Sequence, residues 1–274
     1  MSGQGNIRVL LADVDGTLVT DDKVLTEAAR EAASELHRAG IIFAITSGRP
    51  PRGMSMLIKT LALKSPIAGF NGGVFVHPDL SVIESHTLDP AIARRTLRLL
   101  LDQGLDAWVY TEKEWLIRDQ RAPHVEREAW TVKFDAKVVP SFTNAHLAHA
   151  VKIVGVSDDL DLVAACETAA QSALGDGASA KRSQPYYLDV THPQANKGAV
   201  VATLSKLLHI LPAQIATIGD MPNDVAMFRK SGFSIAMGNA SEAVKAQASA
   251  VTDSNENDGF AKAMRKFVLR AVAA

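Results

Sequence analysis

The sequence predicts an α/β protein whose core is a Rossmann-like, doubly wound parallel sheet and which carries an inserted α+β domain. Three observations support this fold class. Short apolar segments alternate with amphipathic helical segments in the first and last parts of the chain. Polar residues capable of chemistry directly follow several of the apolar segments, as at the carboxyl ends of parallel strands. The stretch between these two parts also has helices and short strands, but none of the strand-end acids or glycine-rich turns recurs there.

The first part of the chain predicts alternating strands and helices. The apolar strand segments are residues 7–12, 41–45 and 67–70, and the helical segments are residues 26–40 and 50–61. Thr26 is of a type that caps helix N-termini, and Gly40 is of a type that ends them. Strands that alternate with helices in this way form a parallel sheet with right-handed crossovers.

The middle of the chain predicts a second domain, and the last part returns to the first pattern. A hairpin is expected at residues 74–76 and 82–86, followed by helices at 90–103 and 158–174 and strands at 107–110, 115–118 and 151–156. Strands at 215–218 and 233–237 then alternate with helices at 196–208, 225–229 and 241–248. We therefore expect a core built from residues 1–86 and 185–274, with residues 87–184 inserted as a cap.

Composition narrows the class of partner. The 274 residues carry a formal net charge of −1, so charge gives no reason to expect binding to nucleic acid or to a membrane. The single cysteine, Cys166, lies in an apolar helical stretch and is expected to be buried. A signal-peptide pattern and an apolar run of transmembrane length are both missing from the sequence, which indicates a cytoplasmic protein.

Acidic residues gather at the predicted strand ends. Asp13 and Asp15 follow the first strand, and Asp220 and Asp224 follow the strand at 215–218. Four carboxylates at one edge of a sheet repel one another unless a cation lies among them. Carboxylate oxygen is a hard ligand, and Mg²⁺ binds through a few such groups while keeping several waters. The pattern therefore predicts a Mg²⁺ site.

The same residues resemble the motifs of the haloacid dehalogenase superfamily. Residues 13–17, DVDGT, are similar to the first motif of that family, and residues 219–224, GDMPND, to the fourth. Ser47 stands at the second motif, where Thr is commoner, and Lys197 at the third. An insertion between the second and third motifs is typical of the Cof-like phosphatases, and residues 71–73, 238–240 and 251–255 also resemble that subfamily.

The resemblance implies how the acids act. Asp13 would attack phosphorus and form an aspartyl-phosphate, and Asp15 would serve as general acid and then general base. A carboxyl near other acids can hold a proton at neutral pH, so Asp15 is expected to have a raised pKa. Mg²⁺ would be bound by Asp13, the backbone carbonyl of Asp15 and Asp220, with Asp224 either a ligand itself or next to the ligands.

The resemblance also implies a phosphate site and a substrate class. Ser47, the backbone N–H of Gly48 and Lys197 would bind the phosphoryl oxygens, and Asn223 would position Lys197 or the substrate. The substrate would be a small phosphorylated metabolite, such as a sugar phosphate or a phosphorylated cofactor. The motifs leave its identity, the cap residues that contact it and the oligomeric state open.

Two other functions fit parts of the pattern. A phosphomutase of the phosphomannomutase type would need an arginine-rich second phosphate site in the cap, where Arg94, Arg95, Arg98, Arg118, Arg121, Arg127 and Arg182 are available. The first three lie on an amphipathic helix, where a solvated face is the simpler interpretation. A non-catalytic sensor of phosphorylated ligands would need neither Asp13 nor Asp15.

Several further residues have two possible roles each. Arg49 is either a surface charge at a helix start or a substrate contact, and Asn71 either caps a turn or belongs to the site. The three tryptophans, Trp108, Trp115 and Trp130, are expected to form the core of the cap rather than sugar-binding platforms.

Overall fold

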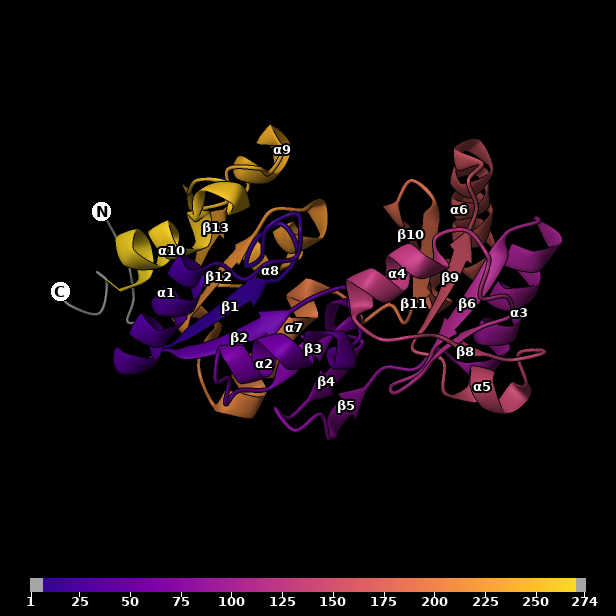
Figure 1. Ribbon diagram of the computed structural model, residues 1–274, viewed down its shortest axis with the longest axis horizontal. Coiled ribbons are helices and arrows are strands. Elements are labelled where there is room, and N and C mark those ends of the chain that lie inside the picture. Colours follow the sequence, from indigo (N-terminus) through magenta and orange to yellow (C-terminus); the bar gives the residue numbers. More distant parts are fainter. Residues whose placement is uncertain (1–6, 270–274) are drawn as a thin grey trace.

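The chain folds around two β-sheets that lie next to each other along the long axis of the molecule (Figure 1). The computed structural model describes residues 7–269. The larger sheet has eight strands in the order β14-β13-β12-β1-β2-β3-β4-β5, and the smaller has six in the order β10-β11-β9-β6-β7-β8. The predicted α/β class is confirmed.

The eight-stranded sheet is parallel over most of its width. Its parallel strands are β1 (Val9–Asp13), β2 (Ile42–Thr46), β3 (Ile67–Gly69), β12 (Ile215–Gly219), β13 (Phe233–Ala236) and β14 (Ala250–Val251). The expected hairpin, β4 (Val74–Val76) and β5 (Val82–Ser85), adds two antiparallel strands at one edge. In the register of the central strands Asp13 lies opposite Thr46, so the ends of β1 and β2 coincide.

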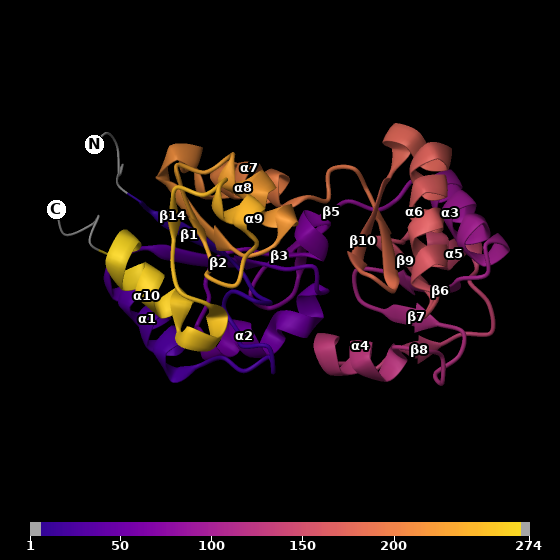
Figure 2. The ribbon, with the colours of Figure 1, turned by 90° about the horizontal axis from the view of Figure 1, so that it is seen from above.

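Helices cover both faces of this sheet, as a doubly wound fold requires (Figure 2). One face packs against α1 (Glu27–Arg38), α2 (Ser55–Thr60) and α10 (Gly259–Ala263), and the other against α7 (Lys197–Leu208), α8 (Val225–Phe228) and α9 (Glu242–Lys245). Successive residues of β1 point to opposite faces, so Leu10 packs with the first set and Leu11 with the second. Helices shield both faces of the sheet from water, which explains why the strand segments are almost wholly apolar.

Local signals in the sequence set the helix boundaries. The Thr26 side chain caps α1 by accepting a hydrogen bond from the Ala29 N–H at 3.2 Å, as predicted. The expected helix at 50–61 begins instead as a 3₁₀ turn, η1 (Pro51–Met54), because consecutive prolines at its start leave the first turn without backbone donors. Other short turns are η2 (Phe70–Gly72), η3 (Gly175–Gly177), η4 (Pro212–Gln214), η5 (Pro222–Asp224) and η6 (Asn255–Asn257), and a π-helical turn, η7 (Met264–Val268), follows α10.

The inserted stretch forms the six-stranded sheet. Its strands are β6 (Asp106–Tyr110), β7 (Trp115–Ile117), β8 (Lys137–Val138), β9 (Lys152–Val156), β10 (Ser179–Gln184) and β11 (Tyr187–Thr191). Its helices are α3 (Pro90–Asp102), α4 (Val125–Val132), α5 (Asn144–Ala148) and α6 (Leu160–Leu174). The face of this sheet away from the larger sheet is covered by α3 and α6 (Figure 2).

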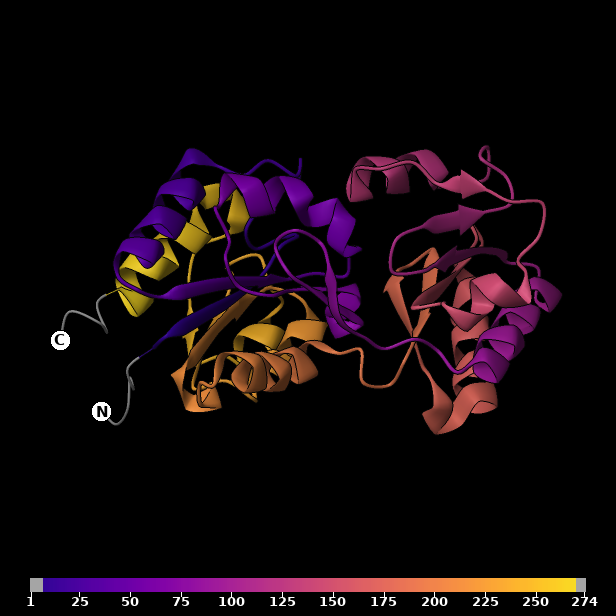
Figure 3. The ribbon, with the colours of Figure 1, turned by 90° about the horizontal axis from the view of Figure 1, so that it is seen from below.

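The second junction between the two parts lies later than the sequence suggested. The sequence pattern places it at Pro185, but β11 pairs with β9 and β10 in the six-stranded sheet. The hairpin between β10 and β11 is tight, so Pro185 marks a turn within the sheet rather than its end. The chain crosses between the sheets twice, after β5 and after β11, and the crossing segments run next to each other (Figure 3). There His86 and His192 stack with ring centroids 5.4 Å apart.

Most of the predicted buried residues of the insert are buried. Cys166 is fully buried in α6, and Trp108 and Trp115 pack edge to face with ring centroids 5.2 Å apart. Trp130 differs from the prediction, because it lies on α4 with 47% of its surface exposed. In the described part of the chain, residues 7–269, the helices are too short or too polar to cross a membrane.

Candidate active site

The candidate site lies where β1, β2 and β12 end. Asp13 is the last residue of β1, Ser47 follows β2 directly, and Asp220 follows β12 directly. Because parallel strands in register end at one edge of the sheet, residues distant in sequence meet there. The structure thus brings together Asp13, Asp220 and Asp224 with Lys197, which begins α7.

Lys197 is the central cation of the site. Its Nζ donates to Asp13 Oδ1 at 2.6 Å and to Asp224 Oδ1 at 2.5 Å, and its side chain is 2% exposed. Burial alone would lower the pKa of Lys197, but the charges of Asp13 and Asp224 outweigh burial and raise it. The ammonium group therefore stays protonated throughout the physiological range.

Three carboxylates surround one ammonium group. Asp13, Asp220 and Asp224 are buried, and each offers one oxygen such that these oxygens lie within 4.8 Å of one another. Burial raises the pKa of Asp13 well above its usual value, and the charges of Asp224 and Asp220 add to this, although Lys197 opposes it. Burial and then the charge of Asp224 raise the pKa of Asp220 to about 6. A buried group of hard oxygens with excess negative charge fits Mg²⁺.

The turn after β12 is held by Asp224. Its Oδ2 accepts from the backbone N–H groups of Asp220 at 3.0 Å and Met221 at 2.8 Å, while its Oδ1 faces Lys197. A Cβ on Gly219 would lie 2.4 Å from the Asp224 carboxyl carbon, so only glycine fits at the end of β12. Asp224 therefore joins the turn, the lysine and the acidic group in one hydrogen-bonded unit.

The loop after β1 is fitted closely against Asp220. Gly16 has φ +77°, and a Cβ there would lie 2.4 Å from Asp220 Oδ2. Thr17 donates to Asp220 Oδ1 at 3.0 Å, and Asn239 donates to Asp220 Oδ2 at 3.2 Å and to the Gly16 carbonyl at 2.9 Å. Sequence reasoning gave no role to Thr17 or Asn239. Their membership of motif-like segments was the one available signal, because only the fold shows that both reach Asp220.

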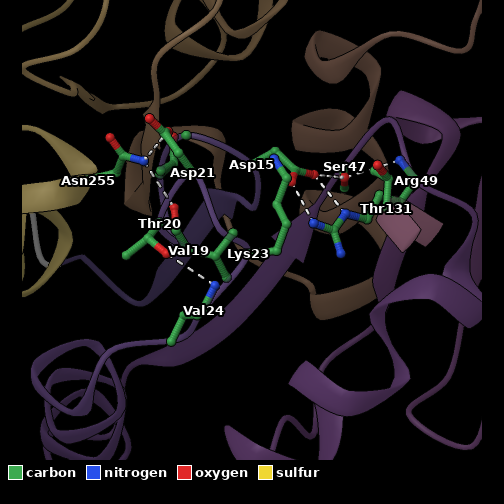
Figure 4. Close-up of polar contacts among 12 residues, drawn as sticks. Asp15, Val19, Thr20, Asp21, Lys23, Val24, Ser47, Arg49, Thr131 and Asn255 are labelled. Atoms are coloured by element: carbon green, nitrogen blue, oxygen red, sulfur yellow. Dashed lines mark hydrogen bonds and ion pairs between the residues drawn. The ribbon is translucent and has the colours of Figure 1, made fainter. Parts of the chain in front are cut away.

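Asp15 is held by two cations, which corrects the expectation of a protonated carboxyl (Figure 4). Arg49 donates to Asp15 through Nε at 2.8 Å and Nη2 at 2.5 Å, and Lys23 Nζ lies 2.8 Å from Asp15 Oδ1. Burial would raise the pKa of Asp15, but Arg49 and then Lys23 outweigh it and lower the pKa. Asp15 is thus ionised, and its side chain stands apart from the three clustered acids.

Arg49 belongs to the site and is not a surface charge. Its side chain is 6% exposed, and its backbone N–H donates to Ser47 Oγ at 3.1 Å. Ser47 Oγ lies 3.5 Å from Asp15 Oδ2, so Ser47 and Arg49 both face Asp15. Neither the spacing nor the residue type distinguished this arrangement from a solvated helix start.

The loops after β2 and β3 interlock at Asn71. This residue adopts φ 57° and ψ 30°, and its N–H donates to the Ser47 carbonyl at 2.8 Å. A Cβ on Gly48 would meet the Asn71 amide at 3.6 Å, and Asn223 donates to Asn71 Oδ1 at 3.3 Å. Within residues 7–269 we find no hydrogen bond from Asn223 to Lys197, so in this arrangement Asn223 contacts Asn71 instead.

Comparisons with known proteins agree with this geometry. A profile of the haloacid dehalogenase-like hydrolases matches residues 10–264. A 5-amino-6-(5-phospho-D-ribitylamino)uracil phosphatase of Bacillus subtilis (strain 168) is 26% identical over 265 residues, covering 96% of this chain and 97% of that protein. An HMP-PP phosphatase of Cronobacter sakazakii is 28% identical over 83% of each chain.

The fold agrees as well. The crystal structure of a haloacid dehalogenase-like hydrolase from Bacteroides thetaiotaomicron superposes with a TM-score of 0.88 at 25% identity, covering 95% of this chain and 99% of that one. The match of the family profile covers both stretches of sequence that build the eight-stranded sheet and the whole insert, which forms the six-stranded sheet. This chain therefore belongs to the haloacid dehalogenase-like hydrolases.

Proposed function

We propose that this chain is a Mg²⁺-dependent phosphatase that hydrolyses a small phosphomonoester, with Asp13 as the nucleophile. The observation that carries the proposal is the position of Asp13, which pairs with Lys197 at 2.6 Å inside a buried group of acids. A carboxylate held by a fixed ammonium at a strand end is positioned to meet a phosphoryl group. The family of this chain, the haloacid dehalogenase-like hydrolases, supports hydrolysis as the reaction.

The acids supply the metal site. We infer that Mg²⁺ would be held by the carboxylates of Asp13 and Asp220 and by the backbone carbonyl of Asp15, with Asp224 beside them. When bound, Mg²⁺ would offset the negative charge shared by the acids and the phosphoryl oxygens. The pKa values of Asp13 and Asp220 are raised first by burial and then by neighbouring carboxylates, and they support this assignment because a bound cation would offset both effects.

The reaction runs in two steps. A carboxylate oxygen of Asp13 attacks phosphorus, the bond from phosphorus to the ester oxygen breaks, and Asp15 gives its proton to that oxygen to release an alcohol. Water then attacks the phosphorus of the aspartyl-phosphate, Asp15 takes up a proton from the water, and inorganic phosphate leaves with Asp13 restored. The sum is one ester and one water converted to one alcohol and one phosphate.

The transferring phosphoryl group needs its own donors. We assign this role to the Ser47 hydroxyl, the Gly48 N–H and Lys197, with Asn223 at the rim of the site. Gly48 and Asn223 both lie at the Asn71 amide, which supports a common position for them. Fixed donors of this kind stabilise charge in the transition state at little cost in reorganisation.

Asp15 must change partners before it can act as an acid. In the present arrangement Arg49 and Lys23 hold it ionised. We infer that substrate binding separates Asp15 from these cations, because a phosphate ester brings negative charge that competes for them. Asp15 would then take up a proton from solvent and donate it to the ester oxygen.

The substrate class follows from relatives and from the cap. Two of the relatives are named as phosphatases of 5-amino-6-(5-phospho-D-ribitylamino)uracil and of HMP-PP, both small phosphorylated compounds. We therefore propose a small phosphorylated metabolite as the substrate. The seven arginines of the insert that a mutase could use are all exposed, so no buried second phosphate site forms from them within residues 7–269.

The proposal is tested by phosphate release. Wild-type protein with Mg²⁺ and a panel of sugar phosphates and phosphorylated cofactors should release inorganic phosphate from some of them. Removing the metal with EDTA should abolish release, and adding Mg²⁺ back should restore it, because the clustered acids cannot hold a phosphate ester unaided. Undiminished release after exhaustive chelation would refute the metal requirement.

A further inference from the structure

One face of the six-stranded sheet points toward the candidate site. Ala107, Val109 and Ile153 pack against α3 and α6 on the far face. The alternate residues of the same strands, Tyr110 and Lys152 among them, therefore point the other way, toward the larger sheet. Figure 2 shows α3 and α6 on the outer side of this sheet.

This inner face adjoins the site through Phe70. The Phe70 ring contacts the Tyr110 ring with centroids 5.6 Å apart, and Lys152 Nζ lies 5.9 Å from the Phe70 centroid. Phe70 directly precedes Asn71, which contacts Asn223 and the Ser47 carbonyl. One aromatic side chain thus separates the inner face of the cap from the proposed phosphate-binding loops.

The inner face carries a cluster of polar groups. Lys152 Nζ donates to Asp189 Oδ2 at 3.2 Å, and the Tyr110 hydroxyl donates to Glu128 Oε1 at 2.6 Å. The other oxygen of Asp189, Oδ1, is buried and has no hydrogen-bond partner in the described part of the chain. The face therefore offers acceptor oxygens of Asp189 and Glu128 whose capacity the protein itself does not use up.

Glu128 extends this cluster to the edge of the catalytic loops. It lies on α4, and α4 packs on η1 so closely that a Cβ on Gly53 would lie 2.6 Å from the Val132 carbonyl oxygen. In Figure 4 Thr131 of α4 appears beside Arg49. Burial raises the pKa of Glu128, and Lys152 and Arg49 are among the charges that oppose the rise, so Glu128 lies within electrostatic reach of both.

The charges of the interior are unfavourable to a second anion. Within residues 7–269 the buried Lys and Arg side chains are Arg49, Lys152 and Lys197. Each is already paired with a carboxylate: Arg49 with Asp15, Lys152 with Asp189, and Lys197 with Asp13 and Asp224. A carboxylate or second phosphate on the leaving group would meet Glu128 and Asp189, and the buried cation of this face, Lys152, already pairs with Asp189.

We propose that Glu128, Lys152 and Asp189 form the subsite for the leaving group, and that this subsite selects a neutral or cationic leaving group with hydrogen-bond donors. The unused acceptor on Asp189 would take a hydroxyl or amine of the substrate, and the two carboxylates would reject an anionic group. This inference rests on the proposed phosphatase function, because it names the alcohol half of that substrate.

A matched pair of substrates tests the selection. Sorbitol 6-phosphate and 6-phosphogluconate share a six-carbon chain and a phosphate on C6, and they differ at C1, where one has a hydroxymethyl group and the other a carboxylate. Wild-type protein with Mg²⁺ should show a kcat/KM at least about tenfold higher for sorbitol 6-phosphate, which corresponds to about 1.4 kcal/mol of transition-state energy. An equal or inverted ratio would overturn the subsite.

Charge-neutral variants locate the selection on the cap. Asp189→Asn and Glu128→Gln keep the shape of the side chain and a hydrogen-bond acceptor but remove one negative charge each. In each variant, the ratio of kcat/KM for sorbitol 6-phosphate to kcat/KM for 6-phosphogluconate should be several-fold lower than in the wild type. Glu167→Gln is the matched control, because Glu167 lies on α6 and pairs with Arg182 on the far face of the sheet. Its ratio should stay at the wild-type value. Thermal denaturation identifies any variant that fails to fold, and the other variant then still tests the subsite.

Acetyl phosphate separates this inference from the proposed function. Its leaving group, acetate, is too small to reach the proposed subsite on the cap. The rate of its hydrolysis therefore measures the activity of the catalytic core alone. Suppose that Asp189→Asn and Glu128→Gln both hydrolyse acetyl phosphate and both keep the wild-type ratio of kcat/KM for the two sugar phosphates. That result would refute the subsite and leave the proposed function standing. No Mg²⁺-dependent hydrolysis of acetyl phosphate or of either sugar phosphate would refute the proposed function itself.

Discussion

At the scale of single residues, the site depends on charges that oppose one another across short distances. Lys197 balances one of three buried carboxylates, and burial, followed by the charge of the neighbouring acids, raises the pKa values of Asp13 and Asp220. Asp15 shows the reverse, because Arg49 and Lys23 hold it ionised. The sequence predicted which residues gather, but the protonation of Asp15 depends on the orientation of two cations and could not be predicted from spacing.

The pKa of Asp220 predicts how Mg²⁺ binding depends on pH. Without metal, the folded protein holds a proton on Asp220 up to about pH 6. The unfolded chain releases that proton near the ordinary aspartate pKa of about 3.9, so the metal-free stability falls as pH rises between these values. Mg²⁺ needs the ionised carboxylate and should restore that stability above about pH 6 but little below it.

Thermal denaturation measures this dependence. At about 100 times its Kd, Mg²⁺ should raise the Tm by about 5–10 °C at about pH 7.5. The rise should be much smaller at about pH 5, where protons compete for the carboxylate. Asp220→Asn removes the titrating group and should show little Mg²⁺ effect at either pH. Equal shifts at both pH values in the wild type would contradict the assignment of Asp220.

At the scale of elements, short helices place the functional groups and their caps fix where those helices begin. Asn196 caps α7 by accepting from the Ala199 N–H at 2.9 Å, and Lys197 is the first residue of that helix. Both the cap residue and the helix were visible in the sequence as Asn196-Lys197-Gly198. The pairing of Thr17 and Asn239 with Asp220 was not, because it joins loops from distant segments.

Removing the α7 cap should weaken both stability and catalysis. Asn196→Ala removes the side-chain acceptor of the Ala199 N–H and should cost about 1 kcal/mol, or about 2–4 °C in Tm. We expect a several-fold fall in kcat because Lys197 loses its fixed starting point. Asn196→Ser keeps a capping oxygen and should stay close to wild type in both measurements. A kcat unchanged in Asn196→Ala, with the Tm lowered, would show that the cap does not position Lys197.

At the scale of the whole molecule, the proposed catalytic and specificity roles belong to different sheets. The predicted catalytic and metal-binding residues come from strands and helices around the eight-stranded sheet, whereas the proposed leaving-group subsite comes from the six-stranded sheet and α4. The sequence predicted this order of elements because each has a strong local pattern. It placed the second junction too early, because the turn residues at Pro185 look the same within a sheet as at its boundary.

Removing the insert should separate these roles. We expect a chain in which a Gly/Ser linker replaces residues 87–191 to bind Mg²⁺ and to hydrolyse acetyl phosphate slowly, because the acidic group and Lys197 remain. It should lose discrimination among larger substrates, whose leaving groups would meet only solvent. Specificity constants for both kinds of substrate, with circular dichroism as a check of folding, measure this. A folded core that kept the wild-type preference would assign the selectivity to the larger sheet.

The most direct test of the account is to trap the phosphoryl group on Asp13. Acetyl phosphate has a leaving group that needs no proton, so Asp15→Asn should still be phosphorylated but should lose its phosphoryl group slowly without the general base. With Mg²⁺, mass spectrometry of acid-quenched Asp15→Asn should then find one added phosphoryl group on the peptide that contains Asp13. The double variant with Asp13→Asn should carry none. A phosphoryl group on another residue, or an Asp13→Asn single variant with wild-type turnover, would contradict Asp13 as the nucleophile.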